Sequence, residues 1–189
     1  MKKETEIKLA VRDARSARRR LLAAGFRVFL RRTFETNLVF DTDGMTLRRS
    51  SRLLRLRQAG KTVTLTYKGA PLPGKHKSRE ELEVEVADLA ATAEILGRLG
   101  YRQVFRYDKY RAEFHQPSHS GVAMLDETPV GVFIELEGSP SWIDRTSRTL
   151  GFHEDAYITA SYGRLYLEWC AAHRRKPTQM TFPRTEPRP

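Results

Sequence analysis

Apolar and polar residues alternate along much of the chain, and this alternation predicts a series of short β-strands. Near the amino terminus, Ile7 and Leu9 are separated by charged residues such as Glu6 and Lys8. A period of two places the apolar side chains on one face of a strand and the charged ones on the other. The same reasoning predicts strands over residues 1–11, 37–41, 53–58, 62–68, 79–86, 104–114, 122–126 and 132–137.

Two stretches between the strands repeat their small and apolar residues every three or four positions, as amphipathic helices do. The first covers residues 12–24 and precedes Gly25, and the second follows Asp88 and ends at Gly100. Aspartate is a favoured N-cap and glycine is favoured after the last turn, so these boundaries match known helix signals. Both helices follow a glutamate-rich strand, which leaves an internal duplication open as a hypothesis. Further helices are expected after Pro140 and over residues 161–172.

The faces of the predicted strands bear on the fold class. Each strand has one apolar face and one face of mixed charge, which a strand of an open antiparallel sheet would also show. The many apolar faces need cover, and the predicted helices can supply it. If helices cover the outside, the charged faces line the inside of a closed sheet, which would enclose a water-filled tunnel. We therefore predict an α+β fold in which helices pack outside an antiparallel β-barrel.

Composition limits the cellular compartment and the kinds of binding partner that we expect. The chain has 189 residues, a formal net charge of +11 and 40% hydrophobic residues, which suits a domain with a core and favours polyanionic partners. The single cysteine, Cys170, excludes an intramolecular disulfide framework, and no run approaches the ~20 apolar residues of a membrane span. We expect a soluble, cytoplasmic protein with one domain over residues 1–173 and a basic, proline-containing, disordered tail over residues 174–189.

The charged strand faces define the candidate site. Successive residues on one face of a strand lie ~7 Å apart, so long side chains from several strands can converge on one ligand. Arginine and lysine match phosphate oxygens, whereas crowded carboxylates need a cation among them and favour Mg²⁺ or Mn²⁺. Together they indicate a site for a metal-bound polyphosphate. The basic candidates are Lys8, Arg55, Arg57, Lys68, Arg79, Lys109 and Arg111, and the carboxylates are Glu4, Glu6, Glu81, Glu83, Asp126, Glu135 and Glu137.

These residues also occur in the order of a known family. Residues 4–8 match the ExExK signature of the CYTH superfamily, the triphosphate tunnel metalloenzymes. The segments that follow in order are LLRLRQ, TLTYKG, SREELEVEV, YDKYRAEF, MLDETPVG, FIELEG and ASYGRL. The chain therefore resembles this superfamily over residues 4 to 168. The resemblance implies an eight-stranded antiparallel tunnel with helices outside, in agreement with the charge pattern.

The resemblance also implies roles for the charged residues. The basic side chains would grip the triphosphate, and Lys8 would contact a phosphate or orient the nucleophile. A divalent metal, Mg²⁺ or Mn²⁺, would be held by the carboxylates Glu4, Glu6, Asp126, Glu135 and Glu137. Glu81 and Glu83 are catalytic candidates together with Lys8, but their role stays ambiguous. They could bind a second metal, activate water, or hold Arg55 and Arg57 in place as structural ion pairs.

Two reactions share this machinery. If water attacks, the enzyme hydrolyses a linear triphosphate, which could be inorganic triphosphate, thiamine triphosphate or a nucleoside triphosphate. If the ribose 3′ hydroxyl of ATP attacks the α-phosphate, the enzyme is a class IV adenylyl cyclase that releases cyclic AMP and pyrophosphate. We rank hydrolysis first, because it needs no adenine pocket.

A third hypothesis is a non-catalytic module that binds RNA or polyphosphate. Carboxylate-rich strands would repel a nucleic-acid backbone, so we rank this hypothesis last. The expected partner is thus a small triphosphate, without a membrane or a nucleic acid, and a homodimer is compatible with the sequence.

One further segment has a phosphate-binding pattern. Residues 69–75 read GAPLPGK, which fits the beginning of a phosphate-binding loop. His76 stands where such a loop needs Ser or Thr, and two prolines remove amide donors. We interpret the segment as a mobile loop at the tunnel mouth, where Lys75 and Lys77 attract substrate.

Overall fold

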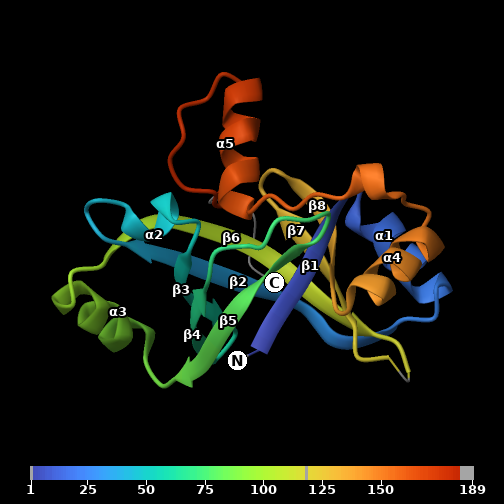
Figure 1. The fold of residues 1–189 in the computed structure, drawn as a ribbon, viewed down its shortest axis with the longest axis horizontal. Helices are drawn as coiled ribbons and strands as arrows, with labels where there is room; N and C mark the ends of the chain where they lie inside the picture. Colours follow the sequence, from blue (N-terminus) through green and yellow to red (C-terminus); the bar gives the residue numbers. More distant parts are fainter. Residues whose placement is uncertain (1, 118, 184–189) are drawn as a thin grey trace.

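A closed antiparallel barrel forms the centre of the molecule. The computed structural model describes residues 2–117 and 119–183, and in this part of the chain eight strands close in the order β1-β5-β4-β3-β2-β6-β7-β8 (Figure 1). The strands are β1 (Lys2–Val11), β2 (Arg27–Asp41), β3 (Leu53–Ala59), β4 (Thr62–Lys68), β5 (Lys77–Val86), β6 (Arg102–His115), β7 (Val122–Thr128) and β8 (Gly131–Glu137). The helices are α1 (Ala14–Ala23), α2 (Thr46–Arg49), α3 (Leu89–Arg98), α4 (Pro140–Thr149), the 3₁₀ helix η1 (Glu154–Ala156) and α5 (Tyr162–Ala172). The predicted eight-stranded α+β barrel is confirmed.

The two faces of β1 show why the sheet closes. Ile7 and Leu9 are fully buried in an apolar cluster that includes residues of α1 and α4. Glu6 and Lys8, which alternate with them, are almost as deeply buried but make polar contacts inside the barrel. A strand that is buried on both faces needs apolar cover outside and paired charges inside. The inside-out charge pattern predicted from the sequence is therefore the real arrangement.

Three apolar clusters attach the helices to the outside and to one end of the barrel. One cluster joins α1 and α4 to β1, β7 and β8, a second joins α3 to β2, β3 and β4, and a third joins α5 to β6 and β8. Trp142 of α4 packs so closely over Gly121 that a Cβ there would lie 2.3 Å from its ring. Glycine at this position is therefore required for α4 to lie against the sheet.

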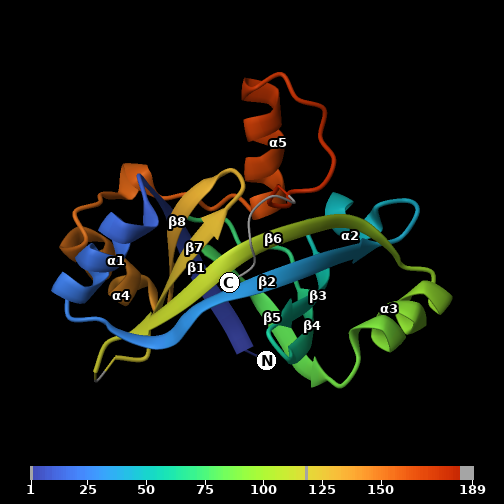
Figure 2. The same ribbon diagram turned by 180° about the vertical axis from the view of Figure 1, so that it is seen from behind.

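The helix boundaries follow the sequence signals. Asp13 and Asp88 accept hydrogen bonds from Ser16 and Ala91 and so cap α1 and α3, which makes α1 shorter at its start than the predicted range. Gly25, after the end of α1, has a positive φ of 84°, which glycine adopts without strain. The two strand-helix-strand units lie side by side, because β1 pairs with β5 and β2 pairs with β6 (Figure 2). This pairing agrees with the hypothesis of a duplicated unit.

β2 is longer than the sequence predicted. The alternation predicted a strand over residues 37–41, but β2 begins at Arg27 and pairs with β6 along most of its length. The added residues include register shifts between Val28 and Leu30 and between Leu30 and Thr33, so they interrupt the period of two. Pairing with a long partner strand, rather than local alternation, fixes this part of the strand.

Two isolated segments complete strand edges that the neighbouring strands leave open. β7 pairs with β6 only from Tyr110 onward, and Met180 exchanges backbone hydrogen bonds with the earlier part of β6. Ile158 does the same for β1 beside Lys8, beyond the last residue paired with β5. Met180 is fully buried, so the prediction of a disordered tail is wrong for residues 174–183. Residues 184–189 lie outside the described residues.

A membrane-spanning helix is absent from residues 2–117 and 119–183, since none of their helices is long and apolar enough to cross a bilayer.

Candidate active site

The barrel brings the predicted site residues into one polar lumen. The predicted basic and acidic side chains make ion pairs and hydrogen bonds with one another across the strands. Glu137 is half-buried on β8 and lies opposite Glu6 in the strand register. Separate strands contribute these side chains, so the site exists only when the barrel is closed.

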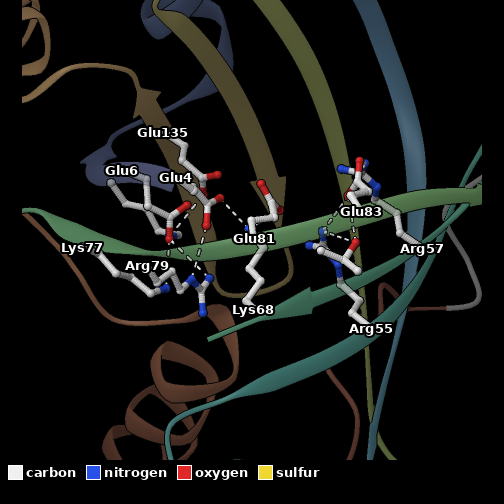
Figure 3. A network of polar contacts seen from close by, with 12 residues as sticks. Glu4, Glu6, Arg55, Arg57, Lys68, Lys77, Arg79, Glu81, Glu83 and Glu135 are labelled. Carbon is white, nitrogen blue, oxygen red and sulfur yellow. Dashed lines mark hydrogen bonds and ion pairs between the residues drawn. The ribbon is translucent and has the colours of Figure 1, made fainter. Parts of the chain in front are cut away.

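The first group of contacts surrounds the beginning of β1 (Figure 3). Glu4 accepts hydrogen bonds from Lys68 of β4 and from Arg79 of β5, with 3.2 Å between Arg79 Nε and Glu4 Oε2. Glu81 pairs with the same Lys68 at 3.0 Å. Glu6 accepts a hydrogen bond of 2.9 Å from Lys77 of β5. Strands β1, β4 and β5 thus meet through alternating positive and negative groups.

The second group lies deeper in the lumen. Lys8 Nζ bridges two carboxylates, Glu6 at 3.4 Å and Glu135 at 3.2 Å. Arg111 holds Asp126 with two hydrogen bonds of 2.7 and 2.6 Å, and it also reaches Glu135 at 3.1 Å. The Arg111 contact is a bidentate fork, the same geometry with which arginine binds a phosphate. One chain of contacts therefore runs from β1 through β8 to β6 and β7.

The third group joins β3, β4 and β5 and is more exposed. Arg57 donates to Glu83 at 3.2 Å, and Arg55 lies 3.7 Å from the same carboxylate. Thr66 also donates to Glu83, at 2.8 Å. Figure 3 shows Arg55, Arg57 and Glu83 grouped apart from the Glu4 and Glu6 contacts. In this arrangement Glu83 holds the two arginines, one of the three roles that the sequence left open.

The lumen charges shift each other's pKa values. Burial opposes the ionisation of Glu6, but the fields of Lys8 and Lys77 hold its pKa well below the usual value. Burial likewise opposes ionisation of Asp126, and Arg111 with Lys109 lowers its pKa instead. For Lys8, burial favours the neutral form, yet Glu135 and Glu6 raise the pKa above its ordinary value. These groups are therefore charged at neutral pH.

Lys77 is a lumen residue that the sequence interpretation misplaced. The sequence pattern predicts that Lys77 belongs to a mobile loop, but Lys77 begins β5, is buried and contacts Glu6. Burial lowers its pKa to about 8, against the attraction of Glu6, and the positive charge of Lys8 adds to the decrease. The signal was present, since Lys77 lies two positions before Arg79 and therefore shares its face.

The loop before Lys77 is attached to α4 in this structure. Lys75 pairs with Asp144 at 2.9 Å and with Glu154, while His76 Nε2 lies 2.8 Å from Asp144. Lys75 and Lys77 thus contact different partners, because Lys75 lies in the loop before β5 and Lys77 is the first residue of that strand. The expectation that both lysines lie in one substrate-attracting loop is wrong.

Two further residues of the lumen were missed. Glu35 of β2 is buried and lies 3.5 Å from Lys109, but the predicted strand did not reach it. Tyr162, at the start of α5, donates a hydrogen bond of 2.6 Å to Asp126, and its ring lies 5.1 Å from Lys8 Nζ. Burial and the Asp126 charge raise the pKa of Tyr162 well above its usual value, which keeps the hydroxyl protonated as a donor. Only the tertiary fold places a helix residue in this position.

The lumen carboxylates have the chemistry of a divalent-metal site. Glu6 and Glu135 already share one cation, the Lys8 ammonium group, and the pKa of each carboxyl is lowered, so both are ionised ligands at neutral pH. In the described part of the chain, no three acidic, histidine or cysteine side chains are grouped as a metal centre. Carboxylate oxygens are ligands that suit Mg²⁺ or Mn²⁺. In this structure the lumen carboxylates pair with lysine and arginine side chains.

A closed antiparallel barrel with helices outside and paired lysine, arginine and glutamate side chains inside defines a tunnel domain with a charged lumen. The chain belongs to the CYTH domain family, whose model matches residues 2–179. The resemblance inferred from the ExExK segment and the ordered strands is thereby confirmed.

Known proteins resemble the chain over most of its length. A protein of Methanocaldococcus jannaschii, named as a candidate adenylate cyclase, is 29% identical over 147 residues, which are 78% of this chain and 83% of that protein. The structure of a Pyrococcus horikoshii protein has a TM-score of 0.74 and 25% identity, and the match covers 87% of this chain and 98% of the other. A candidate adenylyl cyclase from Hippeastrum, described as having a dominant triphosphatase activity, has a TM-score of 0.63 and 22% identity, with 87% and 95% coverage.

Proposed function

We propose that this protein hydrolyses a linear triphosphate inside its barrel with the help of Mg²⁺ or Mn²⁺. The observation that carries the proposal is the convergence of basic side chains from five strands with carboxylates in one buried lumen. The basic side chains are Lys8, Arg55, Arg57, Lys68, Lys77, Arg79, Lys109 and Arg111.

The balance of charges supports a metal-bound anion over an anion alone. Arg111 and Arg79 are neutralised by Asp126 and Glu4, so a free polyphosphate would have to displace carboxylates and leave them unpaired. A triphosphate that arrives with a divalent cation supplies both signs. The arginines and lysines would then bind the phosphates, carboxylates such as Glu6 and Glu135 would hold the cation, and the buried charges would stay paired.

The protein's own residues bind and position the substrate. The guanidinium fork of Arg111 matches two phosphate oxygens, and Lys8, held charged by Glu135 and Glu6, offers a point charge. The metal, bound by carboxylates such as Glu6 and Glu135, would draw negative charge from the phosphates. In hydrolysis, water oxygen bonds to a phosphorus atom while the bridging P–O bond breaks and the remaining phosphate leaves. Catalysis then rests on positioning and electrostatics.

An adenylyl cyclase is the second candidate, supported by the name of the Methanocaldococcus jannaschii relative. It would use the same grip on the triphosphate but direct the ribose 3′ hydroxyl at the α-phosphate. Candidate cyclase names and hydrolysis occur together in this fold, since the Hippeastrum protein is described as a dominant triphosphatase. Hydrolysis is our first choice.

Direct assay of the purified chain separates these functions. The protein is incubated with tripolyphosphate, thiamine triphosphate or ATP, each with Mg²⁺, Mn²⁺ or EDTA, and orthophosphate, pyrophosphate and cyclic AMP are quantified separately. We expect orthophosphate release that requires the metal. Cyclic AMP as the main product from ATP would favour the cyclase, and turnover in EDTA would refute the metal-dependent scheme.

Two lumen variants test whether the charges act as proposed. Glu135→Gln should lower the metal-dependent rate about a hundredfold, a larger effect than its effect on folding, and Arg57→Ala should raise KM for the triphosphate. Glu94→Gln, on the exposed surface of α3, is the matched control for the first change. Wild-type kinetics in both lumen variants would show that these side chains do not contact the substrate.

A further inference from the structure

An apolar segment with an arginine at each end is exposed outside the barrel. Val28, Phe29 and Leu30, at the start of β2, are exposed by 37%, 70% and 38%. Arg27 precedes them and Arg31 follows them, and both arginines are exposed as well. Three neighbouring apolar side chains in contact with water are unfavourable, and such patches mark interaction sites. The 27–31 segment therefore needs an explanation outside the triphosphate lumen.

Two register shifts produce this exposure. They lie between Val28 and Leu30 and between Leu30 and Thr33, where β2 pairs with β6. A bulge turns neighbouring side chains away from strict alternation, so three apolar residues in succession reach the surface. On its other edge, β2 has no strand partner before Glu35 among the described residues. Figure 2 shows the start of β2 beside the end of β6, at the edge of the molecule near α1.

The 27–31 segment belongs to a strongly basic part of the chain. Residues 14–34 contain seven arginines and no aspartate or glutamate. Within residues 2–117 and 119–183, only Arg32 of these seven pairs with a carboxylate, and Arg20 bonds to a backbone oxygen. The other five are Arg15, Arg18, Arg19, Arg27 and Arg31, and all of them are exposed. Their charges are therefore available to an anionic partner.

Helix α1 carries part of this charge and is joined to the segment. Gln116, which follows the β6 residue that pairs with Arg27, donates a hydrogen bond of 2.9 Å to the backbone oxygen of Ala24, just after α1. Leu22, in the last turn of α1, is 40% exposed, and Arg18 and Arg19 share its face because they precede it by four and three positions. Exposed arginines thus lie both in the segment and on the helix that leads to it.

The partner must offer anionic groups and an apolar phase together. The surface of a bilayer with anionic lipids has both, since its phosphates lie directly above the acyl chains. A single-stranded RNA also has phosphates, but Val28 and Leu30 have no ring on which a base can stack. His115 already covers one face of the Phe29 ring, with 4.2 Å between the ring centroids. The chemistry of the segment therefore favours the bilayer over RNA.

Two protein partners fit less well. A second copy that docked through the same patch about a twofold axis would bring like-charged arginines together, which opposes association. A strand added by another protein would need a regular hydrogen-bond ladder, and the register shifts between Val28 and Thr33 interrupt it.

We propose that the 27–31 segment and the arginine face of α1 form a docking surface for membranes that contain anionic phospholipids. Val28, Phe29 and Leu30 enter the boundary between headgroups and acyl chains, and the flanking arginines bind lipid phosphates. The sequence led us to expect no membrane partner, because no apolar run spans a bilayer, but peripheral docking needs no such run. The proposal is independent of the triphosphate activity.

Vesicle binding of the full chain tests this surface. Wild type, Phe29→Ala and the double variant Arg27→Gln/Arg31→Gln are sedimented with vesicles of phosphatidylcholine alone or of phosphatidylcholine and phosphatidylglycerol in equal parts. Leu99→Ala and Arg98→Gln change an exposed apolar residue and an exposed arginine at the end of α3, so they are the matched controls.

We expect wild type to bind the phosphatidylglycerol vesicles and not those of phosphatidylcholine alone, with binding that weakens as salt is added. Phe29→Ala should bind about tenfold more weakly, and the double variant should lose about fivefold for each arginine. Both controls should bind as wild type does. In Phe29→Trp, lipids brominated on the acyl chains should quench the added fluorescence, which would place this side chain in the bilayer.

Absence of binding to the phosphatidylglycerol vesicles, or equal binding by wild type and the two test variants, would overturn the docking surface. Tighter binding to an oligouridylate RNA than to the vesicles would assign the patch to nucleic acid. A dimer in sedimentation velocity that Phe29→Ala abolishes would assign it to a second copy, and either result also overturns the proposal. If Phe29→Ala does not fold, the double variant decides the test, because both of its arginines are exposed.

Discussion

Single residues in the lumen are stabilised by charges that come from other strands. Lys8 is charged because Glu135 and Glu6 outweigh the effect of burial, and Asp126 is charged because of Arg111 and Lys109. In each case, attraction between the opposite charges offsets the free energy of removing both groups from water, which a single buried charge would leave uncompensated. The exception is Lys77, where burial and neighbouring cations outweigh Glu6 and the pKa falls to about 8.

Lys77 therefore makes stability depend on alkaline pH. Its folded pKa lies below the usual lysine value, so below pH 8 the charged form is penalised in the folded protein. Between pH 8 and about 10.4 the folded state releases the proton and the unfolded state retains it, so the free energy of unfolding rises. We expect wild type to gain roughly 1–3 kcal/mol relative to Lys77→Met over this range.

Urea denaturation of wild type and Lys77→Met at pH 7 and pH 10 measures this difference. Lys61→Met, at an exposed position in the turn between β3 and β4, controls for the general effect of removing a lysine. Parallel pH profiles for wild type and Lys77→Met would contradict the lowered pKa.

Some segments are held in place by backbone hydrogen bonds to strand edges that the neighbouring strand does not cover. β6 continues beyond the reach of β7, and the segment after α5 covers the exposed edge through Met180. Met180 packs in a cluster with Tyr107, Phe133 and Tyr162, which lie at the end of the lumen. The segment that the sequence placed in a disordered tail thus supports the wall that carries Tyr107.

Met180→Ala should destabilise the protein by about 2–4 kcal/mol, because it removes a fully buried side chain from this cluster. Thermal or urea unfolding of the variant gives the value. Lys176→Ala, an exposed position in the same segment, should change the free energy of unfolding by less than about 0.5 kcal/mol. Equal stability of the two variants would show that the segment does not pack on β6.

The whole barrel keeps its carboxylates ionised in a buried lumen. The pKa values of Glu6, Asp126 and Glu135 all lie below their ordinary values because lysine and arginine side chains surround them. These ion pairs contribute to the free energy of unfolding at neutral pH. They form only in the closed barrel. Buried pairs are screened little by salt, in contrast with surface pairs.

Acid should therefore unfold the wild-type protein through the lumen. A lowered folded pKa contributes stability above the unfolded value, and the contribution is lost as pH falls from about 4 toward the folded pKa values. Asp126→Asn should cost about 3 kcal/mol at pH 7, because Arg111 and Lys109 lose a charged partner, and its stability should fall less steeply below pH 4.

Unfolding by urea at pH 7, 4 and 3 for wild type and Asp126→Asn checks the prediction, with Glu94→Gln as a surface control. Adding salt to 0.5 M should shift the wild-type curve little. A steep acid loss that is identical in the Asp126 variant would place the responsible carboxylates elsewhere.

Local pattern was sufficient for most elements and for most of the site. The period of two located β4 at its observed bounds, and the Asp88 cap located α3. The same period assigned Arg55, Lys109 and the other predicted residues to one face, and that face is the lumen. These features depend on neighbours one to four positions apart, which a single sequence contains.

Long-range contacts decided the remainder. The part of β2 before residue 37 is a strand because β6 runs beside it, and this part brings Glu35 into the lumen. Tyr162 reaches Asp126 from a helix far along the chain, and Met180 is ordered by the open edge of β6. No local period encodes which distant segment meets which edge.

The sequence by itself determined the alternating faces, the helix caps and the charges of the inner wall, because each is fixed by the identity and spacing of nearby residues. The tertiary structure alone decided which charges pair, which pKa values shift, and which distant segments cover the open strand edges. Those properties arise from closing the barrel, which brings distant strands within contact distance and excludes water from between them.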